Sequence, residues 1–204
     1  MTSHLSGVQF ELVGGHPALD LVNTLDWRFR EGAPEDLLAG YSDLLRFADQ
    51  SEILSSKQIR QILRTVTDRS GAEALVACRE LREAAAEILY AAIDDRTPPA
   101  SQIKIVERCF KEARDHQRLA FSGSHLDWEW PPSECGPDLP FWMLCVSTAR
   151  LLISERVRLV RACEKPDCRW LFLDTSKNHS RRWCDMKICG NRMKARRFKA
   201  QHRG

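Results

Sequence analysis

The sequence predicts a mainly α-helical domain with a small β-hairpin, followed by a treble-clef-like finger built on four cysteines. Three observations carry this prediction. Apolar residues recur at helical spacing through most of the N-terminal part. Strand-like segments flank Gly123-Ser124, a pair that favours a tight turn. Near the C-terminus lie two cysteine pairs with four residues inside each pair and fifteen between them: Cys163 and Cys168, then Cys184 and Cys189.

The N-terminal part is predicted to begin with a strand and to continue in five helices. In the first helix, apolar residues from Leu19 to Phe29 recur at nearly helical spacing. Serines at 55, 56 and 101 are typical helix-start residues, and the fourth helix is rich in alanine, the strongest helix former. The predicted strand and helices cover 8–13, 18–30, 41–48, 55–66, 72–93 and 101–116.

The pattern changes after the fifth helix. Segments 118–122 and 125–130 are predicted to pair as the hairpin, and the four prolines within 131–140 predict a loop. Segment 141–162 has the pattern of a long amphipathic helix that delivers the chain to Cys163. We therefore expect the finger to be fixed rigidly to the helical domain.

Charge divides the chain into two parts of opposite sign, although the whole carries only +3. Residues 156–204 contain 15 lysines and arginines and 4 acidic residues, which gives +11. Residues 1–155 contain 16 and 24, which gives −8. A basic segment attracts polyanions, whereas an acidic one is repelled by them. The sequence thus predicts a helical domain at 1–161 and a nucleic-acid-seeking finger at 162–204.

The cellular compartment decides whether the cysteines form disulfides or bind a metal. The first ten residues lack a basic region followed by an apolar stretch, and no apolar run is long enough to span a membrane. We expect a cytoplasmic protein, in which structural disulfides are rare. Four clustered thiolates then suit zinc, with an iron–sulfur cluster as the alternative. The remaining cysteines are interpreted as small core residues: Cys78, Cys109, Cys135 and Cys145.

The finger is predicted in four steps. Residues 164–167 form a knuckle between the first two ligands, 170–173 form an apolar strand, and 174–180 form a polar turn. Trp183 lies on the returning partner strand, and Cys189 opens a helix. A unit of this size cannot hold a core of its own, so the metal supplies folding energy.

Basic and polar residues around the last two cysteines are the predicted nucleic-acid contacts: Arg181, Arg182, Asn191, Arg192, Lys194, Arg196, Arg197 and Lys199. Asn191 and Arg192 have two interpretations. They contact bases or phosphates, or else Asn191 caps backbone groups beside the metal and Arg192 pairs with an acidic residue. The alternative for the cations that follow is a solvated basic face. Gly190 is interpreted as a steric requirement beside the metal, and Trp183 as a core residue.

A second polar cluster lies in the N-terminal segment. Asp20, Asn23, Trp27 and Arg28 follow the Gly14-Gly15 turn, and the first three have helical spacing. They are the predicted ligand-binding residues of a small-molecule pocket. The alternative is structural, with Asp20 and Asn23 accepting hydrogen bonds from backbone donors of the turn.

Two segments resemble known families. The C-terminal part resembles the CGNR zinc-finger family through CRWLFLDTSKNHSRRW and the CDMKICGNRMKARRF that follows it. The N-terminal VGGHPALDLVNTLDWR resembles the start of the ABATE domain, from which it departs at His16-Pro17. The resemblance implies a bacterial, stress-induced transcription regulator with one zinc ion.

Three functions compete on these observations. The first is a DNA-binding regulator, possible as a homodimer because one finger reads few base pairs, whose helical domain senses a ligand or partner. The second is an RNA-binding or protein-interaction adaptor with a purely structural zinc site. The third, an enzyme built around Asp20, Asn23 and Arg28, is disfavoured because no phosphate loop, nucleophile elbow or His-Glu metal helix appears, and no catalytic residue is predicted.

Overall fold

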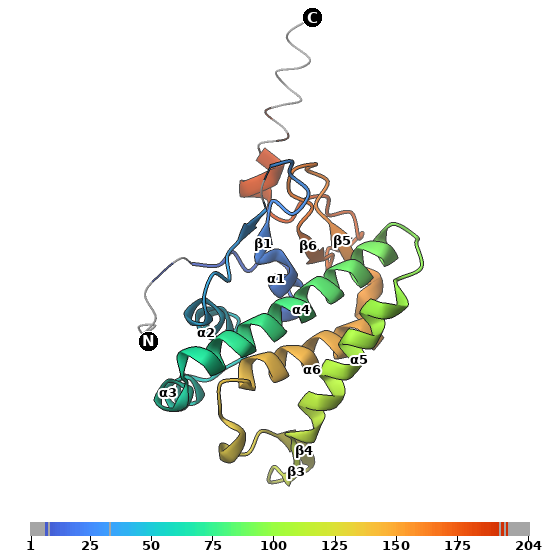
Figure 1. The fold of residues 1–204 in the computed structure, drawn as a ribbon. Helices are drawn as coiled ribbons and strands as arrows, with labels where there is room; N and C mark the ends of the chain where they lie inside the picture. Colours follow the sequence, from blue (N-terminus) through green and yellow to red (C-terminus); the bar gives the residue numbers. More distant parts are fainter. Residues whose placement is uncertain (1–6, 8, 33, 192, 194, 196–204) are drawn as a thin grey trace, which may run out of the picture.

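The computed structural model describes residues 7, 9–32, 34–191, 193 and 195 (Figure 1). Its helices are α1 Pro17–Asn23, α2 Tyr41–Gln50, α3 Ser56–Thr65, α4 Asp68–Ile93, α5 Ala100–Asp115 and α6 Leu139–Ile153. Within these residues, antiparallel strands pair as β1 Leu25–Asp26 with β2 Glu35–Asp36, β3 Arg118–Phe121 with β4 Leu126–Glu129, and β5 Val160–Ala162 with β6 Leu171–Leu173. Short helical turns cover Pro132–Glu134, Glu155–Leu159 and Met186–Gly190.

The long helix α4 organises the molecule. Helices α5 and α6 pack beside it, and α1 lies between α4 and the β5–β6 sheet. The cysteine finger lies at one end of the molecule, and the β3–β4 hairpin lies at the opposite end (Figure 1). Among the described residues, no helix is both long enough and apolar enough to cross a membrane.

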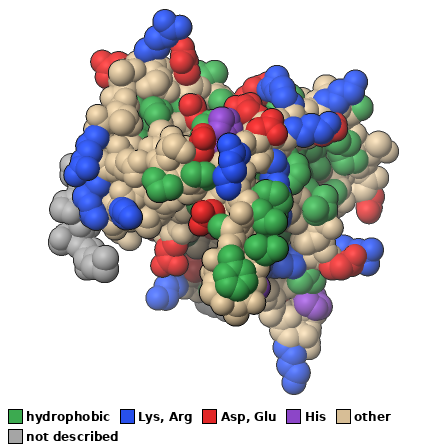
Figure 2. Space-filling model, turned by 90° about the horizontal axis from the view of Figure 1, so that it is seen from below, with side chains coloured by type: hydrophobic (Ala, Val, Ile, Leu, Met, Phe, Trp, Pro, Cys, Tyr) green, Lys and Arg blue, Asp and Glu red, His purple; other side chains and the backbone are tan. Residues whose placement is uncertain are grey.

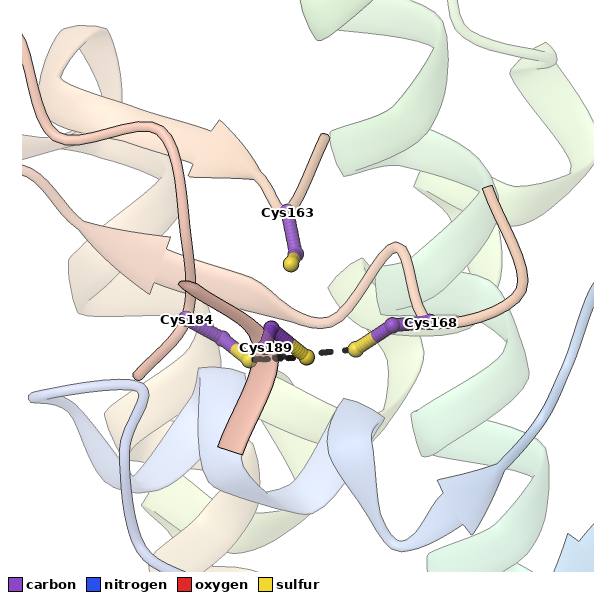
Figure 3. Close-up of side chains that lie close together, drawn as sticks. All are labelled: Cys163, Cys168, Cys184 and Cys189. Atoms are coloured by element: carbon purple, nitrogen blue, oxygen red, sulfur yellow. Dashed lines mark hydrogen bonds between the residues drawn. The ribbon is translucent and has the colours of Figure 1, made fainter. Parts of the chain in front are cut away.

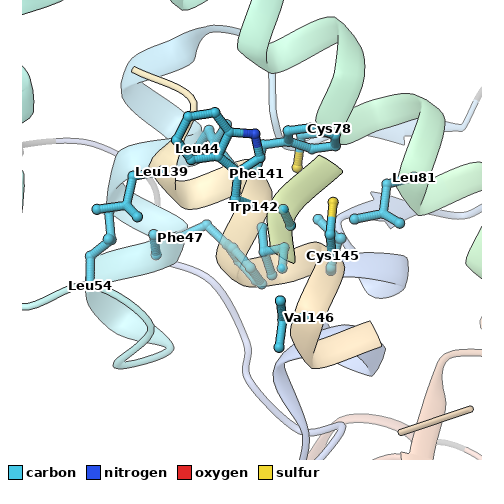
Figure 4. Close-up of a cluster of buried hydrophobic side chains, with 14 of the residues drawn as sticks. Leu44, Phe47, Leu54, Cys78, Leu81, Leu139, Phe141, Trp142, Cys145 and Val146 are labelled. Carbon is cyan, nitrogen blue, oxygen red and sulfur yellow. The ribbon is translucent and has the colours of Figure 1, made fainter. Parts of the chain in front are cut away.

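The main core fills the space between the long helices. Buried side chains from α2, α4, α5 and α6 meet there, among them Phe47, Leu81 and Leu144 (Figure 4). Cys78 and Cys145 are fully buried in the same core, as expected for small apolar side chains.

A second core joins the finger to the helical domain. Leu19 and Val22 of α1 pack with Leu89 of α4, and Leu171 and Leu173 of β6 complete the cluster. Main-chain contacts reinforce this junction, because the amide of Leu173 donates to the carbonyl of Gly14 at 2.9 Å. The finger is therefore anchored to the helical domain by buried apolar surface.

Several predicted elements are confirmed. Helix α2 covers 41–48, and α3 begins after Ser55, whose hydroxyl accepts from the amide of Gln58. The hairpin pairs in the expected register around Gly123. Helix α4 begins four residues before the predicted position because Thr67 caps it, and α5 begins after Pro99 instead of being capped by Ser101.

The first helix is shorter than predicted, and the predicted strand over 8–13 is wrong. Residues 9–13 form no strand. Helix α1 ends at Asn23 because both the amide and the hydroxyl of Thr24 bond to the carbonyl of Leu21. The chain then turns through Trp27, which has a left-handed φ of 54°. Trp27 therefore does not share a helical face with Asp20.

The helix predicted over 141–162 is also too long. It ends at Ile153, and the chain continues through a helical turn into β5. The partner of β6 is β5, which precedes the knuckle, and not a strand at Trp183. The pairing is extended where the amide of Asp174 donates to the carbonyl of Leu159 at 2.8 Å. The last turns of the predicted helix are therefore absent, because these residues pair with β6 as a strand.

Candidate metal centre

The four predicted cysteine ligands meet at one point. Their Sγ atoms all lie within 4.8 Å of one another (Figure 3). The Sγ of Cys184 lies 3.8 Å from that of Cys168 and 3.6 Å from that of Cys189. Four sulfurs bound tetrahedrally to zinc at about 2.3 Å lie about 3.8 Å apart. The cluster therefore has the size of a zinc–thiolate tetrahedron.

Local hydrogen bonds set the direction of each cysteine. Cys163 follows β5, and its amide donates to the carbonyl of Trp170 at 2.9 Å, which closes the knuckle. The amide of Cys168 donates to the carbonyl of Lys165 at the same distance. Cys189 lies in the turn Met186–Gly190, which Asp185 caps by accepting from two backbone amides. Each ligand pair is therefore held by its own tight turn.

The electrostatics of the cluster favour a bound cation. Hydrogen bonds from the thiols of Cys168, Cys184 and Cys189 lower the pKa of Cys163, whereas the same cluster raises the pKa of Cys184. Four thiolates repel one another unless a cation neutralises them. All four are buried, and no histidine or carboxylate of the described residues joins the group. The site holds one zinc ion per chain, and four thiolates leave it no open position for catalysis.

An apolar shell encloses the metal site. Trp170, Phe172 and Trp183 are buried around the cysteines. A Cβ on Gly190 would lie 2.6 Å from the sulfur of Met186 and 3.1 Å from the Trp183 ring. The core interpretation of Trp183 is confirmed, whereas the steric interpretation of Gly190 stays a prediction because the nearest atoms are the flexible end of Met186.

The side chain of Arg181, predicted to contact nucleic acid, bonds to main-chain carbonyls of the protein. Its guanidinium donates to the carbonyls of Trp183 at 2.9 Å, Val13 at 3.3 Å and Cys184, and it lies 4.3 Å over the ring of Phe172. These contacts tie the loop before Cys184 to the N-terminal segment. The guanidinium of Arg181 is therefore bonded to the protein itself, and its contact with a nucleic acid stays a prediction.

Of the remaining predicted nucleic-acid residues, Arg182 and Asn191 lie on the surface of the finger. Arg182 is half exposed and pairs with Glu164 across the knuckle. Asn191 is exposed directly after Gly190. Five further residues lie outside the described part of the chain: Arg192, Lys194, Arg196, Arg197 and Lys199.

The four predicted ligand-binding residues do not converge on one pocket. Asp20 accepts a hydrogen bond from the amide of Gly14 at 2.7 Å, which matches the structural alternative. Asn23 bonds both main-chain groups of Leu171, at 2.9 and 2.8 Å. Trp27 lies under the ammonium of Lys165, and Arg28 pairs with Glu83.

Burial changes the acidity of Asp20. Desolvation raises the pKa of this carboxyl to about 6, and the single hydrogen bond from Gly14 only partly opposes it. His16, where the sequence departs from the ABATE pattern, caps α1 by accepting from the amide of Ala18. Asp20 and His16 therefore stabilise the turn to which β6 is hydrogen-bonded.

Sequence reasoning missed the residues that join the two parts. Besides Asn23 and Arg181, the hydroxyl of Tyr90 donates to the carbonyl of Arg169 at 2.9 Å. The indole of Trp170 donates to Asp26 at 2.9 Å. The partners lie more than 75 positions apart, and no local pattern signals such a pair.

Comparison with known families agrees with this geometry. Residues 15–155 match the ABATE model, described as "Putative stress-induced transcription regulator", and residues 159–202 match the CGNR zinc finger. Both models describe regulator or zinc-finger families and not enzymes. A search of curated proteins finds no match to the chain.

Proposed function

Because the chain belongs to the ABATE family and carries a CGNR zinc finger, we propose that it is a DNA-binding transcription regulator whose N-terminal domain senses a small ligand or a partner. The zinc site is structural in this proposal. It orders the finger and sets the point from which the basic segment departs.

One observation carries the proposal. The fourth ligand, Cys189, lies at the start of the basic segment, and the finger is anchored in the second core. Five of the eight residues over 192–199 are Arg or Lys. A cation-rich segment fixed at one end to a rigid, otherwise acidic body suits phosphate contacts along a duplex.

The placement of the tryptophans in and beside the finger favours a duplex over a single strand. Single-strand binders stack bases on exposed rings. Trp170 and Trp183 are instead buried around the cysteines, and Trp27 is covered by Lys165. An RNA-binding or protein-interaction adaptor with the same structural zinc site is the alternative.

The basic segment can be tested by salt titration. Replacing Arg196, Arg197 and Lys199 with alanine should weaken binding to every duplex alike and should reduce the salt dependence of binding, because about three phosphate contacts are lost. Fluorescence anisotropy of labelled DNA and RNA duplexes, each at several salt concentrations, measures both effects and separates the two nucleic acids.

A matched control removes three exposed cations from the helical domain: Arg69, Arg108 and Lys111. This variant should bind DNA like the wild type. Changing Asn191 or Arg192 should alter sequence preference while the zinc content stays constant. Equal binding by the wild type and the first triple variant at low salt would reduce the segment to a solvated basic face.

We further propose that the protein is a homodimer joined through the β3–β4 hairpin. Leu119 faces Trp128 and Phe121 faces Leu126, so alternation places all four side chains on one face. They are 42–69% exposed. Figure 2 views the molecule from this end, where hydrophobic side chains gather near the middle of the surface.

A second copy of the chain is the occupant that this face fits best. Four such side chains expose roughly 400 Å² of apolar surface, within the size range of interaction sites. A stable interface needs about 800 Å² per partner, so the face supplies its apolar centre. A two-stranded hairpin is marginally stable in water unless its face is covered.

A further inference from the structure

A hollow of about 440 Å³ lies where the helical domain meets the finger. Three segments line it: the loop after α1, the end of α4 with the residues that follow it, and the finger residue directly after Cys168. The lining residues are Arg28, Phe29, Ala86, Glu87, Tyr90, Asp94, Arg96 and Arg169. Building on the proposed function, we propose that this hollow binds a small aromatic carboxylate and that the finger responds through Arg169.

Aromatic rings form one wall. Phe29 is 49% exposed, and its ring meets that of Tyr90 edge to face at 4.9 Å between centroids. A planar ligand ring can cover Phe29 and remove that apolar surface from water. Aromatic pairs in offset or edge contact gain energy beyond area burial.

The hollow is also rich in guanidinium groups, and that of Arg169 lies 5.5 Å over the ring of Phe29. Arg96 and Arg169 both form ion pairs with the carboxylate of Asp94, with N–O distances of 3.4 and 3.3 Å. Arg28 pairs with Glu83, and its Nε is buried without a hydrogen-bond partner among the described residues. Arginine presents a planar fork that suits a carboxylate.

The charge balance points to an anion. The lining carries the guanidiniums of Arg28, Arg96 and Arg169 but only two carboxylates, those of Glu87 and Asp94. Glu87 is the remaining acid of the lining and offers an acceptor for a hydroxyl on the ligand ring. A hydroxylated aromatic carboxylate therefore matches the rings, the cations and this acceptor together.

Arg169 connects the hollow to the metal centre. It follows Cys168 directly, has a left-handed φ of 54°, and is held by the hydroxyl of Tyr90 and the carboxylate of Asp94. A bound carboxylate competes with Asp94 for the Arg169 guanidinium and so changes the restraint on the residue beside a zinc ligand. Ligand and finger are thereby coupled, and the coupling is reciprocal.

Binding is tested by calorimetry on the full-length zinc-loaded protein with 4-hydroxybenzoate as the probe. The wild type should bind it, whereas 4-hydroxybenzyl alcohol, which lacks the charge, should bind at least tenfold more weakly. Arg96→Gln and Phe29→Ala should each weaken binding about tenfold. Equal binding of the alcohol, or unchanged affinity in both variants, would overturn the assignment.

Matched controls come from the same chain. Arg108 is 61% exposed and Arg96 is 60% exposed, and each makes one ion pair, so Arg108→Gln should bind like the wild type. Ile103 is as exposed as Phe29, at 48%, and Ile103→Ala should also leave binding unchanged. Weakening by the controls to the same degree would show that the hollow is not the site.

Coupling has its own readout, the rate at which a chelator removes zinc. 4-Hydroxybenzoate should change this rate several-fold in the wild type but not in Arg169→Gln. These measurements use no nucleic acid, so they separate the two proposals. If the protein binds the probe but not DNA, this inference holds and the regulator proposal fails. If it binds DNA but not the probe, the regulator proposal holds and this inference fails.

Discussion

Asn23 shows how one side chain joins the two parts of the molecule. Its amide group donates to the carbonyl of Leu171 and accepts from the amide of the same residue, as a neighbouring strand would. Asn23 and Leu171 are both buried. Water therefore cannot replace these bonds if the side chain is shortened.

Asn23→Ala should lower the free energy of unfolding by about 2–4 kcal/mol, because two buried main-chain groups lose their partner. Urea unfolding of the zinc-loaded protein measures this loss. Asn178→Ala, at an exposed position in the finger, should change stability by less than about 0.5 kcal/mol. Similar values for the two variants would mean that Asn23 does not anchor β6.

The raised pKa of Asp20 predicts that its contribution to the stability of the fold decreases as pH rises, whereas that of most carboxylates increases. Because its folded pKa of about 6 exceeds the ordinary 3.8, the folded state holds the proton more tightly than the unfolded state. The contribution of Asp20 to stability is complete below about pH 4 and is lost as pH rises through 6. Its size is about 3 kcal/mol, from 1.36 kcal/mol per pKa unit.

The test compares Asp20→Asn with the wild type at each pH, so that acid loss of zinc affects both proteins alike. The stability of the variant relative to the wild type should rise between pH 4 and pH 7. Chemical denaturation at several pH values measures the difference. A constant difference would show that the carboxyl titrates normally.

Prediction from sequence succeeded where a signal is local. The spacing of Cys163, Cys168, Cys184 and Cys189 gave the metal ligands without any knowledge of the fold. The main-chain bonds of Arg181 were not predicted, because the sequence shows only its charge and these carbonyls are brought together by the folded chain.

At the scale of elements, the distinction between local and distant signals explains which helix boundaries were predicted wrongly. Helices α2 and α3 carry their own start signals and were predicted closely. The helical pattern over 141–162 continues past Ile153, but strand pairing with β6 and the second core determine the end of α6. Competition between a local pattern and a distant partner is invisible in sequence alone.

The hairpin is the element whose role can be tested most directly. Replacing Phe121 and Leu126 with serine should convert the proposed dimer to a monomer, because the apolar centre of the interface is removed. Analytical ultracentrifugation over a range of protein concentrations measures the change.

The control for that experiment replaces two exposed apolar residues on other elements. Val76 of α4 and Ile103 of α5 are 64% and 48% exposed, and serine at both should leave the dimer intact. A wild type that sediments as a monomer at all concentrations would refute the hairpin interface directly.

At the scale of the whole molecule, three cores of different origin determine how stability is distributed. The helical core is built from α2, α4, α5 and α6 and does not involve the cysteines of the finger. The second core needs β6, and β6 is held in place by the knuckle between Cys163 and Cys168. Loss of the metal should therefore reach the helical domain through the second core, which joins the finger to α1 and to the end of α4.

Cys184→Ser should abolish stoichiometric zinc and open the finger together with α1, while the helical core stays folded. Zinc bound to four thiolates contributes folding free energy directly, and a missing ligand leaves the remaining thiolates uncompensated. Metal analysis should give about one zinc per chain for the wild type and much less for the variant. Amide hydrogen exchange should then rise in β5, β6 and α1 but not in α5 and α6. Cys135→Ser, at a buried cysteine outside the cluster, should retain both zinc and protection. Full zinc content and unchanged exchange in Cys184→Ser would show that the site is not the tetrahedral centre described, and uniform loss of protection would show that the cores do not unfold separately.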